Sequence, residues 1–240
     1  GVGGNKGGVA VRVPIFGRPA VFACSHFAAH QSAVAKRNAD YEQVREGLKF
    51  PSAPHLDADR GGAHAHSMDD AELVVWLGDF NYRVDMGRDE CVRNVAVGKL
   101  APLLEKDQCC AEMRAGRVFR GLREAQVAFP PTYKFDKGAA DTLAYDSSEK
   151  RRVPSWCDRV VFRAGRPGGA AGPGEAVPGA PAGEAALHDV TATPVAYGSC
   201  PDVLDSDHKP VRLLLRVELP HVDEARRRAL ALRVLAEHEG

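Results

Sequence analysis

The sequence has no long hydrophobic run, no net charge and no cysteine pair of the kind that binds zinc. Its 240 residues carry 32 basic and 32 acidic side chains, so the formal net charge is zero. No segment reaches the roughly 18 consecutive apolar residues of a membrane span, which argues against an integral membrane protein. A zero net charge also argues against a protein that binds nucleic acid along its whole surface, although it permits local basic patches.

The cysteines have no spacing that indicates a metal site. The six lie at positions 24, 91, 109, 110, 157 and 200 and form no CxxC pair. They therefore indicate neither zinc binding nor the disulfide framework of a small secreted domain. The N-terminus has no apolar stretch of the kind found in signal peptides, so we expect a reduced, cytoplasmic compartment. The chain begins without Met in a glycine-rich stretch, and we expect it to be a fragment of a longer protein.

The composition is that of a globular domain built from helices and strands. Hydrophobic residues make up 44% of the chain and charged residues 27%, ordinary values that argue against wholesale disorder. Strands are predicted for short β-prone runs at 9–13, 20–24, 73–77, 156–162, 188–197 and 211–219. Helices are predicted for 31–49, for most of 89–126 with breaks at Gly98 and Gly116, and for 221–238.

Two segments have the composition of loops. Residues 50–70 are polar, and residues 164–186 are rich in Gly, Pro and Ala with no aromatic side chain. The second segment buries too little apolar surface to offset the entropy of ordering it, so we expect a disordered insertion. The expected organisation is one α/β domain over 1–220, followed by a helical tail over 221–240.

Four polar clusters lie where predicted strands begin or end. They are Ser25-His26, Asp79 with Asn81, Asp158-Arg159 and Asp207-His208. Strand ends are a common place for site residues in α/β proteins, so all four clusters could meet at one edge of a sheet.

The clusters that contain Asp79 and Asp158 each allow two interpretations. Asp79 and Asn81 lie on the same side of an extended chain, where a carboxylate can bind a hard cation or polarise a water and an amide can orient it. The sequence Gly-Asp-x-Asn is equally suitable for a turn. Asp158 lies in an otherwise apolar strand and needs a partner, either a histidine, a cation or Arg159 in a structural ion pair.

The histidines are also open to a structural interpretation. Asp207 and His208 could orient a metal and polarise a phosphoryl oxygen, although a lone histidine is more often structural. His26 ends a predicted strand, and His30 lies one helical turn further on if a helix begins there.

Basic residues gather around Tyr133 and Tyr145. They are Lys134, Lys137, Lys150, Arg151 and Arg152. Such a run is usually a solvated face. Beside a metal site, it also suits a multiply phosphorylated substrate.

Several longer motifs resemble those of one enzyme family. The segments WLGDFNYRV, PPTYKFD, YDSSEKRRVPSWCDRV and SDHKPV, in this order, resemble the signature set of the inositol polyphosphate 5-phosphatases. GNKGGVAVR and SHFAAH resemble two further blocks, so the likeness extends from Gly3 to Leu219. The metal and phosphate residues alone also fit the apurinic endonucleases, deoxyribonucleases and sphingomyelinases of the wider superfamily. The flanking Asn-Tyr-Arg, Pro-Ser-Trp-Cys-Asp-Arg and Tyr-Lys elements favour the 5-phosphatases.

The resemblance implies a fold, an activity and a set of catalytic residues. The fold is a four-layered α/β/β/α sandwich of the DNase I type. The activity is magnesium-dependent removal of the 5-phosphate from phosphoinositides such as phosphatidylinositol 4,5-bisphosphate, or from soluble inositol polyphosphates. Asp79 would activate the attacking water, and Asn81 would hold that water or the phosphate. Asp158 would orient His208 against the phosphate, and His26 would neutralise the phosphate or assist the leaving oxygen.

The resemblance also implies substrate and metal contacts. The substrate contacts are Lys6, Tyr133, Lys134, Lys150 and Arg159. Tyr133, Lys134 and Lys150 would contact the 4-phosphate, and Lys6 the 1-phosphate side. Asp207 would lie near Mg²⁺, whose principal ligand in the family is a Glu expected upstream of this chain.

Two other functions remain open. The first is a catalytically inactive pseudophosphatase that binds phosphoinositide headgroups, because the Glu segment lies outside the sequence. The second is a nuclease of the same superfamily, which zero net charge and the flanking motifs disfavour. Without a transmembrane span, any membrane contact is expected to be peripheral, and we expect no nucleic-acid partner.

Overall fold

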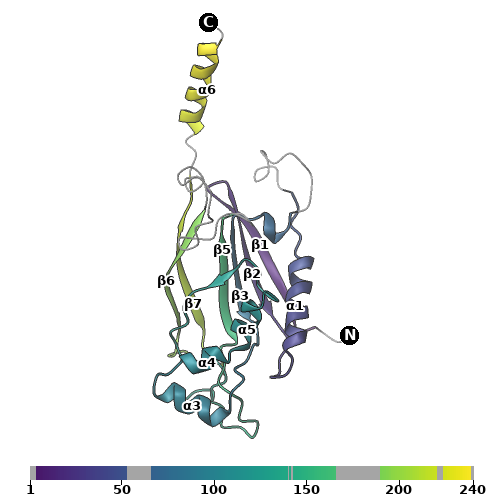
Figure 1. Cartoon of the computed structure of the whole chain (residues 1–240), viewed down its shortest axis with the longest axis vertical. Helices are drawn as coiled ribbons and strands as arrows, with labels where there is room; N and C mark the ends of the chain where they lie inside the picture. The colour runs from purple at the N-terminus through teal and green to yellow at the C-terminus, as the bar shows by residue number, and fades with distance from the viewer. Residues whose placement is uncertain are drawn as a thin grey trace.

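A five-stranded mixed sheet forms the centre of the molecule (Figure 1). The structure is a computed structural model, and it describes residues 4–52, 66–139, 141, 143–165, 190–220 and 224–238. The strand order is β1-β2-β3-β5-β4, with β1 at Gly7–Ile15, β2 at Arg18–His26, β3 at Leu73–Asp79, β5 at Asp158–Ala164 and β4 at Arg123–Glu124. β2 and β3 are parallel, whereas β3 and β5 are antiparallel.

A second sheet and several helices complete the described fold. The second sheet pairs β6 (Thr191–Ser199) with β7 (Val211–Glu218) in antiparallel fashion. The helices are α1 (Val34–Gly47), α3 (Arg88–Ala96), α4 (Ala101–Glu105), α5 (Gln108–Arg114) and α6 (Glu224–His238), with a 3₁₀ turn at Met68–Asp70. Figure 1 shows α6 standing away from the two sheets, and α3 and α4 near one end of the strands. No helix in the described ranges is long and apolar enough to cross a membrane.

Alternation along the strands divides the apolar side chains between two faces of the central sheet. Val74 and Trp76 pack with Tyr41 of α1 and Cys109 of α5 in one buried cluster. The intervening side chains, such as Val75, pack against the second sheet in another cluster. Because successive side chains of a strand point to opposite faces, this pattern assigns every later residue of β3 to one of the two layers.

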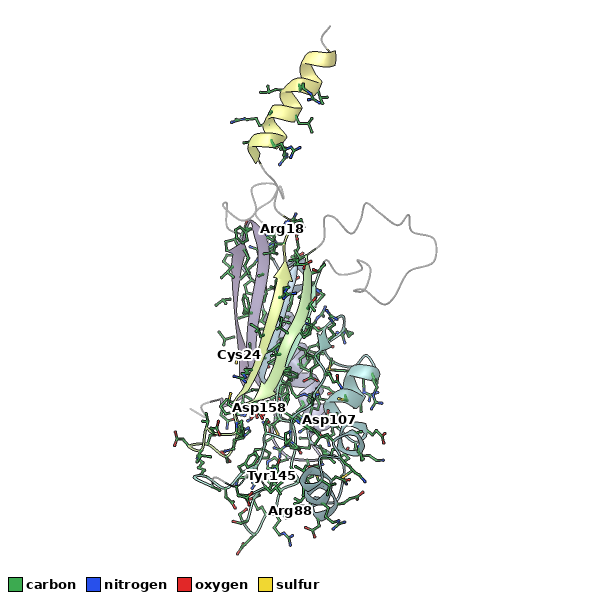
Figure 2. The ribbon with its side chains drawn as sticks, turned by 90° about the vertical axis from the view of Figure 1, so that its left-hand side faces the viewer. Arg18, Cys24, Arg88, Asp107, Tyr145 and Asp158 are labelled. Carbon is green, nitrogen blue, oxygen red and sulfur yellow. The ribbon has the colours of Figure 1, made fainter. Side chains whose placement is uncertain are left out.

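A third apolar cluster lies at one end of the sheets. It joins Cys91 of α3 and Leu103 of α4 to Trp156 and to Tyr145 of the long connection before β5. Figure 2 shows Arg18 at one end of the sheets and Asp158 at the other, with Tyr145 and Arg88 beyond Asp158. This cluster therefore supports the loops that follow the strand ends.

Most of the expected elements are confirmed, with limits. All six predicted strands are present, and helices occur in each predicted helical stretch. Gly98 and Gly116 have φ values of 70° and 66° and lie at helix ends, as expected. The expected helix over 117–126 is wrong, because that stretch contains turns and β4. Residues 53–65 and 166–189, which hold most of the expected loop and insertion, lie outside the described residues.

The layers agree with the expected sandwich as far as the described residues extend. They form a helical layer, the five-stranded sheet and the two-stranded sheet. Leu214 of β7 points away from the central sheet, since Leu213 and Leu215 pack against it, and Leu214 is 58% exposed. Among the described residues, no helix covers the second sheet at this position.

Candidate active site

Three site residues share one row across adjacent strands. His26 of β2 pairs in register with Asp79 of β3, and Asp79 pairs with Asp158 of β5. Each residue has the same parity in its strand as the residues that face the second sheet. The row therefore continues the inter-sheet face beyond its apolar part, where the strands end and the side chains are polar.

Glycine at position 78 allows this row to form. Gly78 has a φ of 141°, and a Cβ atom there would lie 2.0 Å from the carbonyl oxygen of Ser25. Any other residue would push β2 and β3 apart just before Asp79. The hydroxyl of Ser25 accepts a hydrogen bond from Nε1 of Trp76 at 2.9 Å, so Ser25 serves the packing of the two strands.

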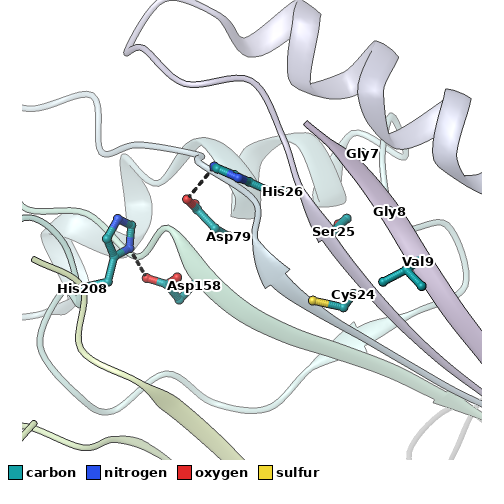
Figure 3. A pocket seen from close by; sticks show the side chains of 9 residues that line it. All are labelled: Gly7, Gly8, Val9, Cys24, Ser25, His26, Asp79, Asp158 and His208. Atoms are coloured by element: carbon teal, nitrogen blue, oxygen red, sulfur yellow. Dashed lines mark hydrogen bonds and ion pairs between the residues drawn. The ribbon is translucent and has the colours of Figure 1, made fainter. Parts of the chain in front are cut away.

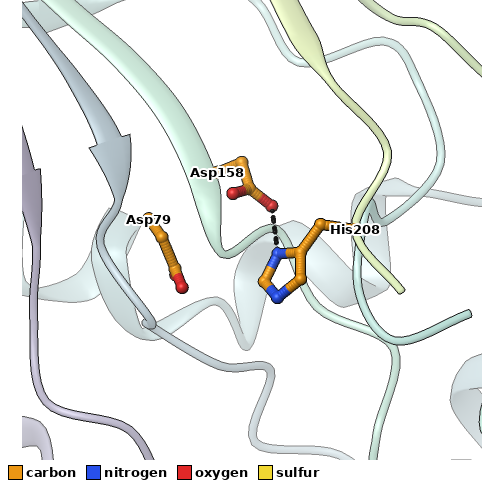
Figure 4. A group of neighbouring side chains, drawn as sticks. All are labelled: Asp79, Asp158 and His208. Atoms are coloured by element: carbon orange, nitrogen blue, oxygen red, sulfur yellow. Dashed lines mark hydrogen bonds and ion pairs between the residues drawn. The ribbon is translucent and has the colours of Figure 1, made fainter. Parts of the chain in front are cut away.

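His208 reaches the row from a loop in front of β7. Its Nδ1 lies 2.8 Å from Oδ2 of Asp158 (Figure 4), and the same oxygen accepts a hydrogen bond from the Thr132 hydroxyl at 3.2 Å. The Tyr133 ring packs on the imidazole with centroids 4.5 Å apart. The backbone amide of Lys209 donates to the carbonyl oxygen of Thr132, which fixes the loop beside β5. Of the three partners considered for Asp158, a histidine, a cation and Arg159, the structure shows the histidine.

Asp79, Asp158 and His208 could hold a metal ion. One ligand atom from each lies within 4.8 Å of the other two. In the described ranges, these three residues are the group of His, Cys, Asp or Glu side chains that comes this close together. Hard cations such as Mg²⁺ and Ca²⁺ prefer carboxylate oxygens, and Mg²⁺ commonly binds through one or two carboxylates plus other oxygens. The donor set therefore fits a divalent cation between the two carboxylates. The carboxylate of Asp207 is not part of this group; its backbone carbonyl accepts a hydrogen bond from Phe135.

Electrostatics in the row favours an added positive charge. Burial, followed by the negative charge of Asp158, raises the pKa of Asp79 above its ordinary value. Burial by itself lowers the pKa of His208, but the hydrogen bond and charge of Asp158 outweigh it, so the pKa of His208 is raised. A cation between the carboxylates would relieve their mutual repulsion.

His26 and Lys6 form the other side of the site. Nε2 of His26 lies 3.2 Å from Oδ2 of Asp79, and Nζ of Lys6 donates to the same ring nitrogen. Burial lowers the pKa of Lys6. A pocket of about 600 Å³ opens over these groups, lined by residues 7–9, 24–26, 79, 158 and 208 (Figure 3). It brings at least one member of each predicted polar cluster together.

Asn81 orients Asp79 rather than facing the pocket. Its Nδ2 donates to Oδ2 of Asp79 and to the carbonyl of Phe27, each at 3.1 Å. Its backbone amide donates to Oδ1 of Asp79 at 3.0 Å. Its Oδ1 accepts a hydrogen bond from Arg83 at 2.7 Å. Arg83 was not among the residues singled out from the sequence, although the alternation Asp79-x-Asn81-x-Arg83 was a usable signal.

The prediction that Arg159 contacts the substrate is wrong, because Arg159 lies on the other side of the central sheet from the pocket. Arg159 follows Asp158 in β5 and so points to the opposite, helix-covered face of the sheet. Its guanidinium is fully buried, with Nη1 2.9 Å from Asp107 and Nε 2.7 Å from Glu124. An arginine whose donors are occupied inside the protein has no access to a ligand in the pocket.

The basic residues near Tyr133 divide into structural and available groups. Asp146 is fully buried and accepts hydrogen bonds from Ser148 and from the backbone of Arg152, and Nζ of Lys134 lies 3.5 Å from it. Arg151 pairs with an aspartate of α3. Lys150 is exposed. Asp146 thus holds together the loop that carries the exposed Lys150.

Comparisons with known proteins give a consistent result. The profile of endonuclease/exonuclease/phosphatase family 2 matches residues 1–214. The chain is 38% identical, over 94% of its length, to type II inositol polyphosphate 5-phosphatase 15 of Arabidopsis thaliana. It is 32% identical, over 98% of its length, to the phosphatidylinositol 4,5-bisphosphate 5-phosphatase INP51 of Saccharomyces cerevisiae. The chain spans 21% and 20% of these two relatives.

A solved structure matches over nearly the whole chain. It is the inositol polyphosphate 5-phosphatase domain of SPsynaptojanin in complex with inositol (1,4)-bisphosphate and a calcium ion. The TM-score is 0.72 at 33% identity, and the match covers 98% of this chain and 58% of that one. A likeness of this extent shows a common fold of the DNase I type.

Proposed function

The chain belongs to the endonuclease/exonuclease/phosphatase family, within it to the inositol polyphosphate 5-phosphatases, and on that premise we propose that it removes the 5-phosphate from phosphorylated inositols with the help of Mg²⁺. The substrates would be phosphoinositides such as phosphatidylinositol 4,5-bisphosphate, soluble inositol polyphosphates, or both. The observation that carries the proposal is the convergence of Asp79, Asp158 and His208 beside His26 in one pocket.

Asp79 is the residue best placed to accept a proton from the attacking water. In hydrolysis, the water oxygen forms a bond to phosphorus while the bond from phosphorus to the inositol oxygen breaks, and the proton of the water needs an acceptor. Burial and Asp158 raise the pKa of Asp79, which brings it closer to that of an effective base. Asn81 holds the carboxylate through two hydrogen bonds and so keeps its direction constant.

The two histidines would stabilise charge on the phosphate. Because Nδ1 of His208 is bonded to Asp158, Nε2 is the ring nitrogen available to a phosphoryl oxygen in the pocket. His26, with Lys6 behind it, would place positive charge near the departing oxygen. Phosphoryl transfer requires mainly positioning and donors toward developing negative charge, and this arrangement supplies both.

A divalent cation held by Asp79 and Asp158 would neutralise charge on the reacting phosphate and polarise its oxygens. The carboxylates are the preferred ligands for Mg²⁺, since His208 already donates to Asp158 and imidazole is a poorer ligand for a hard cation. Asp158 would then serve the cation and the histidine together.

The remaining basic residues would select the substrate. Tyr133, Lys134 and Lys150 would contact the 4-phosphate, and the Tyr133 ring packs on His208. Lys6 would lie toward the 1-phosphate side. Contact with a membrane would be peripheral and would occur in the cytoplasm.

The test is phosphate release from two soluble substrates that differ only at position 5. With Mg²⁺, the chain is expected to release phosphate from inositol 1,4,5-trisphosphate but not from inositol 1,4-bisphosphate, and EDTA is expected to stop the reaction. Vesicles that contain phosphatidylinositol 4,5-bisphosphate separate lipid from soluble specificity. Binding of the trisphosphate without release would replace this proposal with an inactive headgroup-binding protein.

A further inference from the structure

We propose that Arg83 is a positioning residue that fixes the side-chain amide of Asn81 and joins the two halves of the active site. The inference rests on the proposed phosphatase function, because it assigns Arg83 a part in that reaction. Arg83 is 5% exposed and does not line the pocket, so it acts through its neighbours and not on the substrate.

The half of the site that contains Asp79 and Asn81 is held by two donors of the Arg83 guanidinium. Nη2 of Arg83 donates to Oδ1 of Asn81 at 2.7 Å, and Nε donates to the Asn81 backbone carbonyl at 3.0 Å. A guanidinium has donors only, so the amide oxygen of Asn81 must face Arg83 and the NH₂ group must face Asp79. Asn81 also has a φ of 57°, an uncommon backbone conformation that the bond to its carbonyl supports.

The half of the site that contains His208 is held by the planar face of the Arg83 guanidinium. The guanidinium carbon of Arg83 lies 4.4 Å from the centroid of the Tyr133 ring, and Tyr133 packs on His208. The Arg83 side chain therefore contacts both Asn81, which is hydrogen-bonded to Asp79, and Tyr133, which packs on His208. A lysine could keep the charge but not the fork and the planar stack at once.

The backbone of Arg83 is fixed independently of its side chain. Its amide donates to Oε1 of Gln108 at 3.0 Å, and the same oxygen accepts a hydrogen bond from Arg37 at 2.6 Å. The amide group of Gln108 donates to the Gln31 carbonyl and to Asp85. A change confined to the end of the Arg83 side chain should therefore leave the main chain in place.

The kinetic test is a double-mutant cycle between Arg83→Lys and Asn81→Ala. Arg83→Lys is expected to lower kcat on inositol 1,4,5-trisphosphate about 10- to 100-fold, the usual range for loss of a supporting partner, with KM within about twofold. In the Asn81→Ala background, Arg83→Lys should have little further effect on kcat, because the group it orients is gone. Independent, additive losses of kcat would overturn the proposal, as would an unchanged kcat in Arg83→Lys.

Arg163→Lys is the matched control. Arg163 is another nearly buried arginine, in β5 of the central sheet, and it donates to backbone carbonyls before β3 on the helix-covered side. Its replacement is expected to lower the melting temperature without changing kcat. A fall in kcat as large as that of Arg83→Lys would mean that replacing any buried arginine produces the effect, and the positioning role would be rejected.

A second measurement needs no turnover. The side-chain amide of Asn81 is identified by NMR as the signal that Asn81→Ala removes, and its proton exchange is compared in the parent chain and in Arg83→Lys. Exchange at least about tenfold faster in Arg83→Lys is expected, because one of the contacts that lock the amide is lost. Equal exchange would overturn the inference even if the chain hydrolyses its substrate. Faster exchange in a chain without phosphatase activity would uphold the positioning and reject the proposed function.

Discussion

Asp79 and Asp158 are direct register partners across β3 and β5, at the point where the apolar inter-sheet face gives way to polar side chains. The antiparallel pairing brings two carboxylates into one group with His208. The same like-charge contact, added to burial, raises the pKa of Asp79. A cation between these two carboxylates would relieve their mutual repulsion.

Cation binding should depend on Asp79 and on pH. Asp79→Asn is expected to weaken Mn²⁺ binding at least about tenfold, since a charged ligand becomes neutral. In the parent chain the affinity should rise with pH as Asp79 loses its proton, because the cation competes with that proton. Isothermal titration with Mn²⁺ at several pH values checks both. The exposed Asp202 provides the control variant, Asp202→Asn; equal affinity in the two variants would show that Asp79 is not a ligand.

The pKa of His208 should fall when Asp158 is neutralised. Asp158 raises the pKa of the imidazole, so the protonated pair stabilises the folded chain fully below the ordinary histidine value of about 6.5. This stabilisation is lost as pH rises through the folded pKa. Asp158→Asn is expected to lower the pKa of His208 in an NMR titration and to cost more stability at pH 6 than at pH 9. An unchanged pKa would show that the contact does not act on the proton.

Asp146 should stabilise the chain only while it is ionised. Burial by itself raises the pKa of Asp146, but hydrogen bonds from Ser148 and Arg152 and the charge of Lys134 outweigh it and hold the pKa well below its ordinary range. The stabilisation is therefore present above the unfolded carboxyl pKa of about 4 and is lost as pH falls through the folded value. Asp146→Asn is expected to cost about 2 kcal/mol of unfolding free energy at pH 7 and less at pH 3. Urea unfolding at both pH values measures the difference; a constant cost would contradict it.

The site could be predicted from the sequence in its main parts. The positions of His26, Asp79 and Asp158 at strand ends indicated that they could meet at one sheet edge, and the register of β2, β3 and β5 pairs them there. Their exact row depends on register, which is set by long-range pairing and by the close approach at Gly78.

Other features could not be predicted because they depend on the backbone between elements. The turn at Asn81 has a positive φ, and it directs the amide toward Asp79 and Arg83 and away from the pocket. The stretch after Gly116 has helical composition, yet Phe119 and Gly121 have positive φ values and Arg123 pairs with β5. Tertiary pairing outweighs helix propensity there.

The alternation of side chains along β5 is enough to place Arg159. Its neighbour Asp158 points into the pocket, so alternation alone places Arg159 on the opposite face. Arg159→Met is expected to reduce the unfolding free energy by about 3–5 kcal/mol, because Asp107 and Glu124 would be left buried without a counter-charge. KM should not change.

The exposed Arg151 provides the comparison for Arg159. Its side chain is 59% exposed and pairs with Asp89 at the surface, so Arg151→Met should cost less than about 1 kcal/mol. Denaturant unfolding and steady-state kinetics of both variants distinguish the two roles. A raised KM with unchanged stability in Arg159→Met would restore the substrate contact inferred from the motif.

The most direct measurement is the rate of phosphate release from inositol 1,4,5-trisphosphate with Mg²⁺, compared between the parent chain and Asp79→Asn. Removing the carboxylate that we propose accepts the proton and binds the cation is expected to lower kcat about 10²- to 10⁴-fold, while Asp202→Asn keeps the parent rate. If the parent chain and Asp79→Asn released phosphate at the same rate, the row of His26, Asp79 and Asp158 would not be the active site.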